Sequence, residues 1–124
     1  MARLVGAVAL ILGLAQPVFA QTVTLSDAAE IRALDKITGD LADIEIKIGQ
    51  TMQIGRLHVK LDDCRFTAQG DAQIAYAYFE IDDPGLPDPR VFAGWMSADS
   101  PGLNPLDHPR YDIWLLRCKS AATE

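Results

Sequence analysis

The chain has few of the residues on which most active sites and metal centres depend. Its 124 residues include only two histidines and two cysteines. The sequence contains no glycine-rich phosphate-binding loop, no calcium-loop spacing and no paired-cysteine zinc motif. We therefore expect no metal ion and no cofactor, and the composition gives no support to most classes of enzyme.

Basic residues are also in the minority. Eleven Lys and Arg residues stand against 17 Asp and Glu residues, which gives a formal net charge of −6. Nucleic acids and anionic membrane surfaces select for clustered Lys and Arg. The charge balance therefore argues against a nucleic-acid partner and against binding to an anionic bilayer surface.

Long apolar stretches are absent, apart from one at the N-terminus. Arg3 precedes an apolar run over residues 4–14, and small residues follow around Ala20. This order is typical of a secretory signal that is cleaved after Ala20, and the run is shorter than the ~20 residues that a membrane span needs. We therefore expect a signal helix in residues 1–20, export to the periplasm, and no stable membrane insertion after cleavage.

Cleavage at this point would leave 124 − 20 = 104 residues, numbered 21–124. That length is sufficient for one small domain with a limited margin of stability. Losing Arg3 would change the net charge to −6 − 1 = −7. We expect segments 21–29 and 119–124 to be flexible ends of this single domain, although Thr22 to Leu25 could add an edge strand.

The two cysteines, Cys64 and Cys118, both fall within this domain, 118 − 64 = 54 positions apart. In an oxidising compartment they can pair, and a bridge of this span would remove about 4 kcal/mol of unfolded-chain entropy. A redox pair would more often be closely spaced, and a metal site would need further cysteine or histidine neighbours. The export signal favours a structural disulfide, with those two readings as the alternatives.

Short apolar runs separated by turn residues predict strands. Residues 44–48 alternate isoleucine with charged side chains, and residues 57–62 alternate in the same way. This period of two indicates strands with one buried face. Further strands are expected at 30–36, 91–96 and 112–118. Six or seven short strands at intervals of roughly ten residues predict an all-β fold, either a small antiparallel barrel or a sandwich.

One predicted strand differs from the others, because residues 74–81 are largely apolar on both faces. Such a strand is expected in the middle of the domain, covered from two sides. An acidic segment with three prolines, residues 82–90, follows it. Proline excludes both helix and central strand, so this segment is expected to be an exposed loop.

The region 92–118 holds both tryptophans, one of the two cysteines and one of the two histidines. Between its predicted strands lies a loop of turn residues, Ser97 to Tyr111. In this loop, Asp99 or Ser100 can cap a single helical turn that has Pro101 at its first position.

A stiff, exposed loop on a disulfide-closed domain without a catalytic set predicts a contact surface for another protein. The candidate residues of this surface are Trp95, Met96, Asp99, Ser100, Pro101, Asn104, Asp107, His108, Arg110, Tyr111 and Trp114. The alternative is a small-ligand or cell-wall binding module that uses a groove lined by Trp95 or Trp114. If both indoles are instead buried in the core, that alternative loses its support.

A hydrolase is a third interpretation. His108 could act as a base, with Asp107 or Asp112 as the orienting carboxylate and Ser97 or Ser100 as the nucleophile. Only proximity in sequence supports this set, and a structural hydrogen bond between His108 and the backbone is favoured. We therefore expect no catalytic residue. The adjacent pairs Asp62–Asp63 and Asp82–Asp83 would lie on opposite faces of a strand and share no proton or metal ion.

Three stretches resemble a family of exported proteins of unknown function that is widespread in alphaproteobacteria. They are LDKITG at residues 34–39, GWM at 94–96 and SPGLNPLDHPRYDIWLLRC at 100–118. The resemblance implies no activity, but genes of this family tend to lie beside one for a small accessory subunit of respiratory complex I. It therefore favours a non-enzymatic periplasmic domain that belongs to an envelope protein complex, with complex I as one candidate.

Overall fold

A computed structural model describes residue 6 and residues 12–17, 23–69 and 72–120. The predicted cleavage point at Ala20, most of the signal segment 1–20, residues 70–71 and residues 121–124 lie outside the described residues. The signal peptide and the export of the chain therefore stay predictions. Within the ranges given above, no helix is long and apolar enough to cross a bilayer.

The described residues form eight strands and no helix, which confirms the predicted all-β class. The strands are β1 (Thr24–Leu25), β2 (Ala28–Asp35), β3 (Leu41–Lys47), β4 (Thr51–Ile54), β5 (Leu57–Gln69), β6 (Ala72–Asp82), β7 (Arg90–Ser97) and β8 (Tyr111–Lys119). The number of short strands exceeds the expected six or seven because β1 and β4 are brief edge strands.

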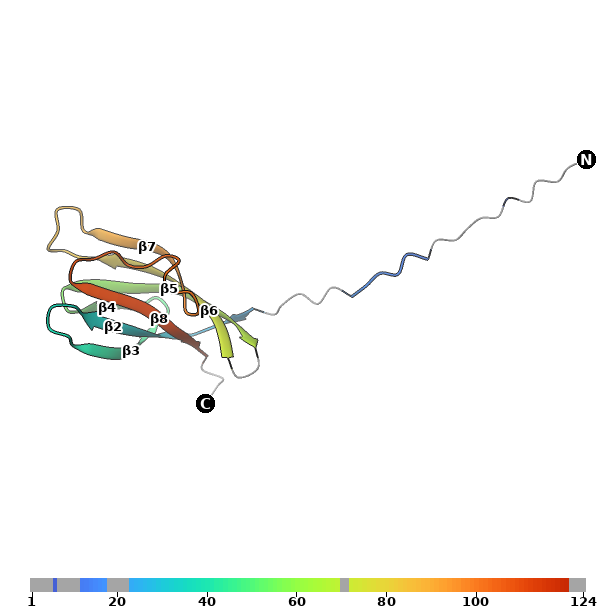
Figure 1. Ribbon diagram of the computed structural model, residues 1–124, viewed down its shortest axis with the longest axis horizontal. Helices are drawn as coiled ribbons and strands as arrows, with labels where there is room; N and C mark the ends of the chain where they lie inside the picture. The colour runs from blue at the N-terminus through green and yellow to red at the C-terminus, as the bar shows by residue number, and fades with distance from the viewer. Residues whose placement is uncertain (1–5, 7–11, 18–22, 70–71, 121–124) are drawn as a thin grey trace, which may run out of the picture.

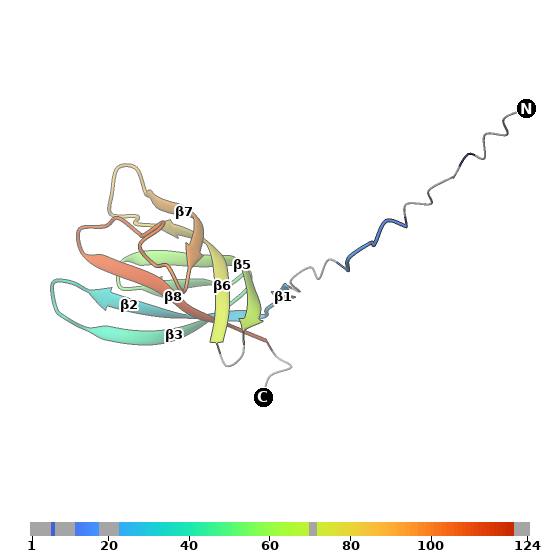
Figure 2. The same cartoon turned by 45° about the vertical axis from the view of Figure 1, so that its right-hand side comes forward.

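Two antiparallel sheets face each other (Figures 1 and 2). The first sheet has the order β1-β5-β6-β7, and β4 also pairs with β5. The second sheet has the order β3-β2-β8. Of the two predicted architectures, the structure is thus a sandwich.

The inner faces of the two sheets supply the core. Ile31, Ile46, Leu61, Phe79 and Leu115 are among the largest buried side chains, and each alternates with more exposed neighbours along its strand. Fully burying a side chain of this size contributes about 1.5–3 kcal/mol. The period-two pattern in the sequence therefore identifies the inner faces correctly.

The outer face of the first sheet contradicts one expectation. In β6, Ala75, Ala77 and Phe79 are buried, but Tyr76 is 45% exposed and Tyr78 is only partly buried. The prediction that this strand is covered from two sides is wrong, because the second sheet packs against only one of its faces. On the other face, Tyr76 and Tyr78 make the sequence look apolar, although one is exposed and the other is only partly buried.

The two ends of the predicted domain contain more regular structure than expected. Within segment 21–29, β1 pairs with β5, and Ala28 and Ala29 are buried at the start of β2. At the other end, Lys119 closes β8 and pairs with Ala28. Residues at these ends become ordered or buried only because they pair with strands that are distant in the sequence. The local sequence does not reveal such pairing.

The predicted disulfide is present between Cys64 of β5 and Cys118 of β8, with Cα atoms 5.8 Å apart. It therefore joins the first sheet to the second. Beside it, the side-chain amide of Gln73 in β6 donates to the Cys118 carbonyl at 3.2 Å and accepts from the Cys118 N–H at 3.2 Å. This amide satisfies backbone groups at the free edge of β8.

Residues 98–110, here called the strap, run back from the end of β7 to the start of β8 (Figure 1). The predicted helical turn is absent. Instead the Leu103 N–H donates to the Ser100 carbonyl at 3.1 Å, which closes a tight turn through Pro101 and Gly102. Pro105 disfavours a helical conformation at Asn104, so the turn does not continue as a helix.

Candidate functional site

The anchored end of the strap is built around a buried carboxylate, Asp83, which follows β6. Its oxygens accept hydrogen bonds from Arg56 Nε at 3.1 Å, Arg56 Nη2 at 3.0 Å and the Gly85 N–H at 2.9 Å. His108 Nε2 lies 2.8 Å from the same carboxylate. Hydrogen bonds from these partners lower the pKa of Asp83 below its usual value, with the largest effect from Arg56 and the next from His108. Burial acts in the opposite direction.

His108 is buried and both of its ring nitrogens are occupied. Nδ1 accepts the backbone N–H groups of Arg110 at 3.0 Å and Tyr111 at 3.1 Å. Because Nδ1 accepts twice, the ring proton is on Nε2 and is donated to Asp83. The predicted hydrogen bond between His108 and the backbone is therefore present, and its role is to hold the turn into β8.

The hypothetical hydrolase set is not assembled. Neither His108 nitrogen faces a serine, since both are bonded to Asp83 and to the backbone. The Ser97 hydroxyl instead accepts the Ser100 N–H at 3.2 Å. Asp107 is exposed, and Asp112 Oδ1 lies 3.7 Å from Lys36 Nζ. The proposed combination of base and nucleophile is thus wrong, because the histidine is committed to the fold.

A second anchor ties the strap to the end of β2. The Arg110 guanidinium bonds Asp35 Oδ2 at 2.9 and 3.1 Å, and Lys36 Nζ donates to the His108 carbonyl at 2.6 Å. The bond from Arg110, aided by the N–H groups of Ile37 and Thr38, lowers the pKa of Asp35 to about 2. This end of the strap is therefore held by charged partners.

Tyr111 connects the anchored end to the hairpin between β4 and β5. Its hydroxyl accepts the Arg56 N–H at 3.2 Å. Gly55, in that hairpin, has φ of +57°, and a Cβ built there would lie 2.5 Å from the hydroxyl. Gly55 therefore lies in a tight turn in which only glycine fits beside the tyrosine ring.

The other half of the strap is exposed. Leu103 has 78% of its surface in solvent, and Pro101 and Gly102 beside it are also exposed. Asn104 Nδ2 donates to the Trp95 carbonyl at 3.0 Å, which fastens this half to β7. The strap therefore presents apolar residues to solvent while its backbone is held at both ends.

The candidate residues of the contact surface divide by burial. Those at the surface are Trp95, Asp99, Pro101, Asn104 and Asp107; those partly buried are Ser100, Arg110 and Trp114; those buried are Met96, His108 and Tyr111. The three buried residues lie beneath the surface and support the strap from the inside.

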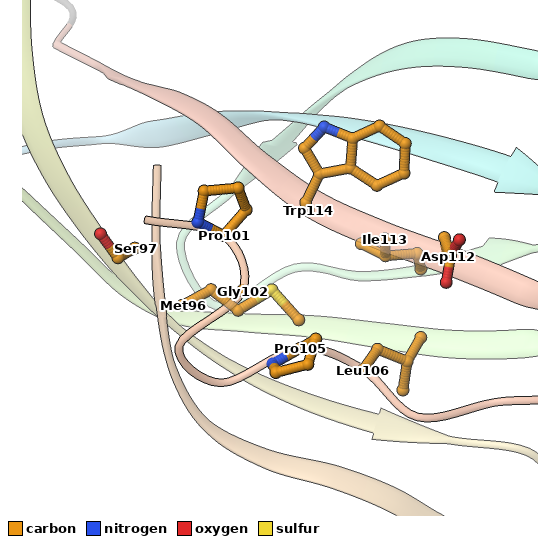
Figure 3. Close-up of a pocket in the computed structure, with 9 residues that line it drawn as sticks. All are labelled: Met96, Ser97, Pro101, Gly102, Pro105, Leu106, Asp112, Ile113 and Trp114. Atoms are coloured by element: carbon orange, nitrogen blue, oxygen red, sulfur yellow. The ribbon is translucent and has the colours of Figure 1, made fainter. Parts of the chain in front are cut away.

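A pocket of about 340 Å³ lies beside the strap (Figure 3). Its lining comes from β7, the strap and β8, and consists of Met96, Ser97, Pro101, Gly102, Pro105, Leu106, Asp112, Ile113 and Trp114. Apart from Ser97 and Asp112, these side chains are apolar. The arrangement can accept a small apolar group with polar contacts at two points.

Trp95 lies elsewhere, on the outer face of the first sheet, and 41% of it is exposed. Its ring packs edge-to-face with Tyr78 at a centroid distance of 5.5 Å, and the Arg65 guanidinium lies 5.7 Å from its centroid. The two indoles therefore belong to separate sites, and neither is fully buried.

Sequence reasoning missed Asp35, Arg56 and Asp83, which hold the strap. One signal was available: the adjacent carboxylates Asp82 and Asp83 were expected to face opposite ways. Their side chains do face opposite ways in the structure: Asp82 pairs with Arg90 on the surface, whereas Asp83 is buried. In the part of the chain that the structure describes, no group of three His, Cys, Asp or Glu side chains could hold a metal ion.

Comparison with known proteins gives the family. The chain is 32% identical over 95 residues to an uncharacterized protein of Rickettsia prowazekii (strain Madrid E), covering 72% of this chain and 59% of that protein. It thus spans about three fifths of the relative's length. No solved structure matches. Residues 29–118, from the start of β2 to the bridged Cys118, match the family described as "Uncharacterized protein conserved in bacteria (DUF2155)". The chain therefore belongs to this bacterial family.

Proposed function

We propose that this chain is a non-enzymatic, exported domain that binds a partner protein of the bacterial envelope. The contact surface is the exposed half of the strap together with the pocket beside it. One observation supports this most strongly: the exposed strap residues Pro101 and Gly102 also form the wall of a largely apolar pocket.

The strap is preorganised for binding. Binding is weakened when a flexible loop must be ordered on contact, and a loop that is already fixed avoids most of that cost. The strap is fixed by His108, Arg110 and Asn104. Apolar anchors that enter such a pocket, surrounded by polar residues, are the usual centres of binding energy.

The finer assignment is to a complex on the periplasmic side of the inner membrane. The exported, alphaproteobacterial character that the sequence resemblance implies supports this location. Respiratory complex I is one candidate, because genes of this kind tend to lie beside one of its small accessory subunits. The acidic net charge of −6 favours a protein partner over an anionic bilayer or nucleic acid.

Two matched variants test the proposal. Leu103→Asp alters the exposed strap, and Leu86→Asp alters the other proline-rich loop, where the leucine is 37% exposed. Because both side chains are on the surface, each variant is expected to change stability by less than about 0.5 kcal/mol. Tagged chains are used to recover proteins from solubilised envelope, followed by mass spectrometry. We expect Leu103→Asp to lose partners that Leu86→Asp retains. Equal recovery of the same proteins by both variants would remove the strap from consideration.

A second candidate is small-ligand binding in the Trp114 pocket. Its volume of about 340 Å³ lies at the lower end of the range of ligand sites. Binding of a small apolar compound would change Trp114 fluorescence in a Trp95→Phe background and raise the melting temperature. If a library of such compounds changes neither, this candidate has no remaining support.

A further inference from the structure

The outer face of the first sheet has a row of aromatic side chains that the strap does not use. Tyr76 and Tyr78 of β6 lie beside Trp95 of β7, with Asp63 and Arg65 of β5 on the other side. Tyr78 is directly opposite Trp95, and Tyr76 is directly opposite Arg65. Since neighbouring strands lie about 4.8 Å apart, these three strands offer a surface about 10 Å wide.

Three polar groups of this row are available to a ligand. Among the residues that the structure covers, no hydrogen-bond partner is found for the hydroxyls of Tyr76 and Tyr78 or for the indole N–H of Trp95. Tyr76 and Trp95 are 45% and 41% exposed. Flat aromatic faces with free hydroxyl and N–H groups at their edges combine apolar contact with hydrogen bonding.

The charges on this face indicate a neutral ligand. Arg65 pairs with Asp63 at 2.8 Å, Lys60 with Asp62 at 3.2 Å, and Arg90 with Glu80 at 3.1 Å. Each cation is therefore already compensated by a carboxylate. Arg90 also pairs with Asp82, so this network holds four carboxylates against three cations. A polyanion such as nucleic acid would find no uncompensated basic group in it, and one excess negative charge offers a cationic ligand little attraction.

We propose that this face, Asp63, Arg65, Tyr76, Tyr78 and Trp95, binds a chain of neutral pyranose sugars. The C–H groups on one side of a pyranose ring carry a small positive charge and pack against the negative face of an aromatic ring. Arg65 already lies over one face of Trp95, 5.7 Å from its centroid, so the sugar packs on the exposed Tyr76 ring and on the remaining face of Trp95. The ring hydroxyls then bond to the tyrosine hydroxyls, the indole N–H and the remaining polar atoms of Arg65 and Asp63, which are joined by one hydrogen bond. This site shares no residue with the pocket beside the strap, and its one link to the strap is the hydrogen bond from Asn104 to the Trp95 carbonyl.

The two tryptophans make the test unambiguous, since each reports one site. Chitotetraose and cellotetraose, both neutral β-1,4-linked chains, are titrated into the purified chain while the two indole N–H signals are followed by NMR. We expect the Trp95 signal to shift and the Trp114 signal to stay. In the Trp95 variants, which lack this signal, binding is followed at the backbone N–H signals of Tyr76 and Tyr78. Trp95→Ala should weaken binding about tenfold, Trp95→Phe should retain most of it, and Leu103→Ala should leave it unchanged.

A melting curve for each variant separates loss of the site from loss of the fold. The proposal is overturned if neither sugar moves the Trp95 signal at millimolar concentration, if Trp114 responds in its place, or if Trp95→Ala binds as tightly as the unaltered chain. It is equally overturned if an envelope protein, and no saccharide, is retained in a Trp95-dependent way. Failure of the strap proposal would leave the Trp95 response intact, so the two can fail separately.

Discussion

The two sheets are joined at two places by different chemistry. Near one end of the sandwich, Cys64 and Cys118 form a covalent bond between the sheets. Near the other, the Tyr111 hydroxyl accepts the Arg56 N–H, and Asp83, His108, Asp35 and Arg110 fasten the strap around that contact. We expect the first connection to be sensitive to reducing agents and the second to be sensitive to acid. The strap therefore depends on the polar end, while overall stability depends more on the covalent end.

The largest expected effect is on the covalent end. Replacing both cysteines, Cys64→Ser with Cys118→Ser, should lower the free energy of unfolding by about 4 kcal/mol, because the bridge restricts the unfolded chain over 54 positions. Urea denaturation at several pH values measures the loss, which should be similar from pH 5 to pH 8. The unaltered chain with and without reductant is the control. If denaturation midpoints agree within error, the bridge has no such role.

A smaller effect is expected at the polar end. His108→Ala removes the acceptor for two backbone N–H groups and one donor to Asp83, all of them buried or partly buried. We expect a loss of about 2–3 kcal/mol and faster hydrogen exchange at Arg110 and Tyr111. His58→Ala, at an exposed position of β5, is the matched control and should cost less than about 0.5 kcal/mol. Equal behaviour of the two variants would contradict the anchoring role of His108.

The smallest effect is the acid dependence of the second anchor. Arg110 lowers the pKa of Asp35 from 3.8 to about 2, so the folded state holds the charged carboxylate more strongly than the unfolded state does. The resulting stabilisation is complete above pH 3.8 and is lost as pH falls through about 2. Asp35→Asn should therefore flatten the fall in melting temperature between these values. Asp88→Asn, in the exposed 82–90 loop, should retain it, and the same slope in both variants would rule out the anchor.

Most of the fold could be predicted because each strand is marked by a pattern of residues that are neighbours in the sequence. Alternation with period two marked the inner faces of β3 and β5, and the export signal led to the correct disulfide. Tyr76 and Tyr78 misled because aromatic residues follow the same apolar pattern whether they face the core or solvent.

The candidate site could be predicted only in part. The segment that becomes the strap was recognised, but its anchors are long-range: Asp83 is 27 positions from Arg56 and 25 from His108, and Asp35 is 75 from Arg110. No sequence period brings such residues together. His108 and Arg110, the strap residues that look most reactive, hold it in place, while Leu103 is 78% exposed to solvent.

The most direct test of a preorganised strap that binds a partner is crosslinking in living cells. A photoreactive phenylalanine analogue is placed at position 103 of the strap or at position 86 of the other proline-rich loop, both in exposed sites. Our account predicts a discrete crosslinked protein from position 103 that is absent from position 86 and is lost when His108→Ala releases the strap. Identical crosslinks from both positions, or a crosslink from position 103 that persists with His108→Ala, would contradict it.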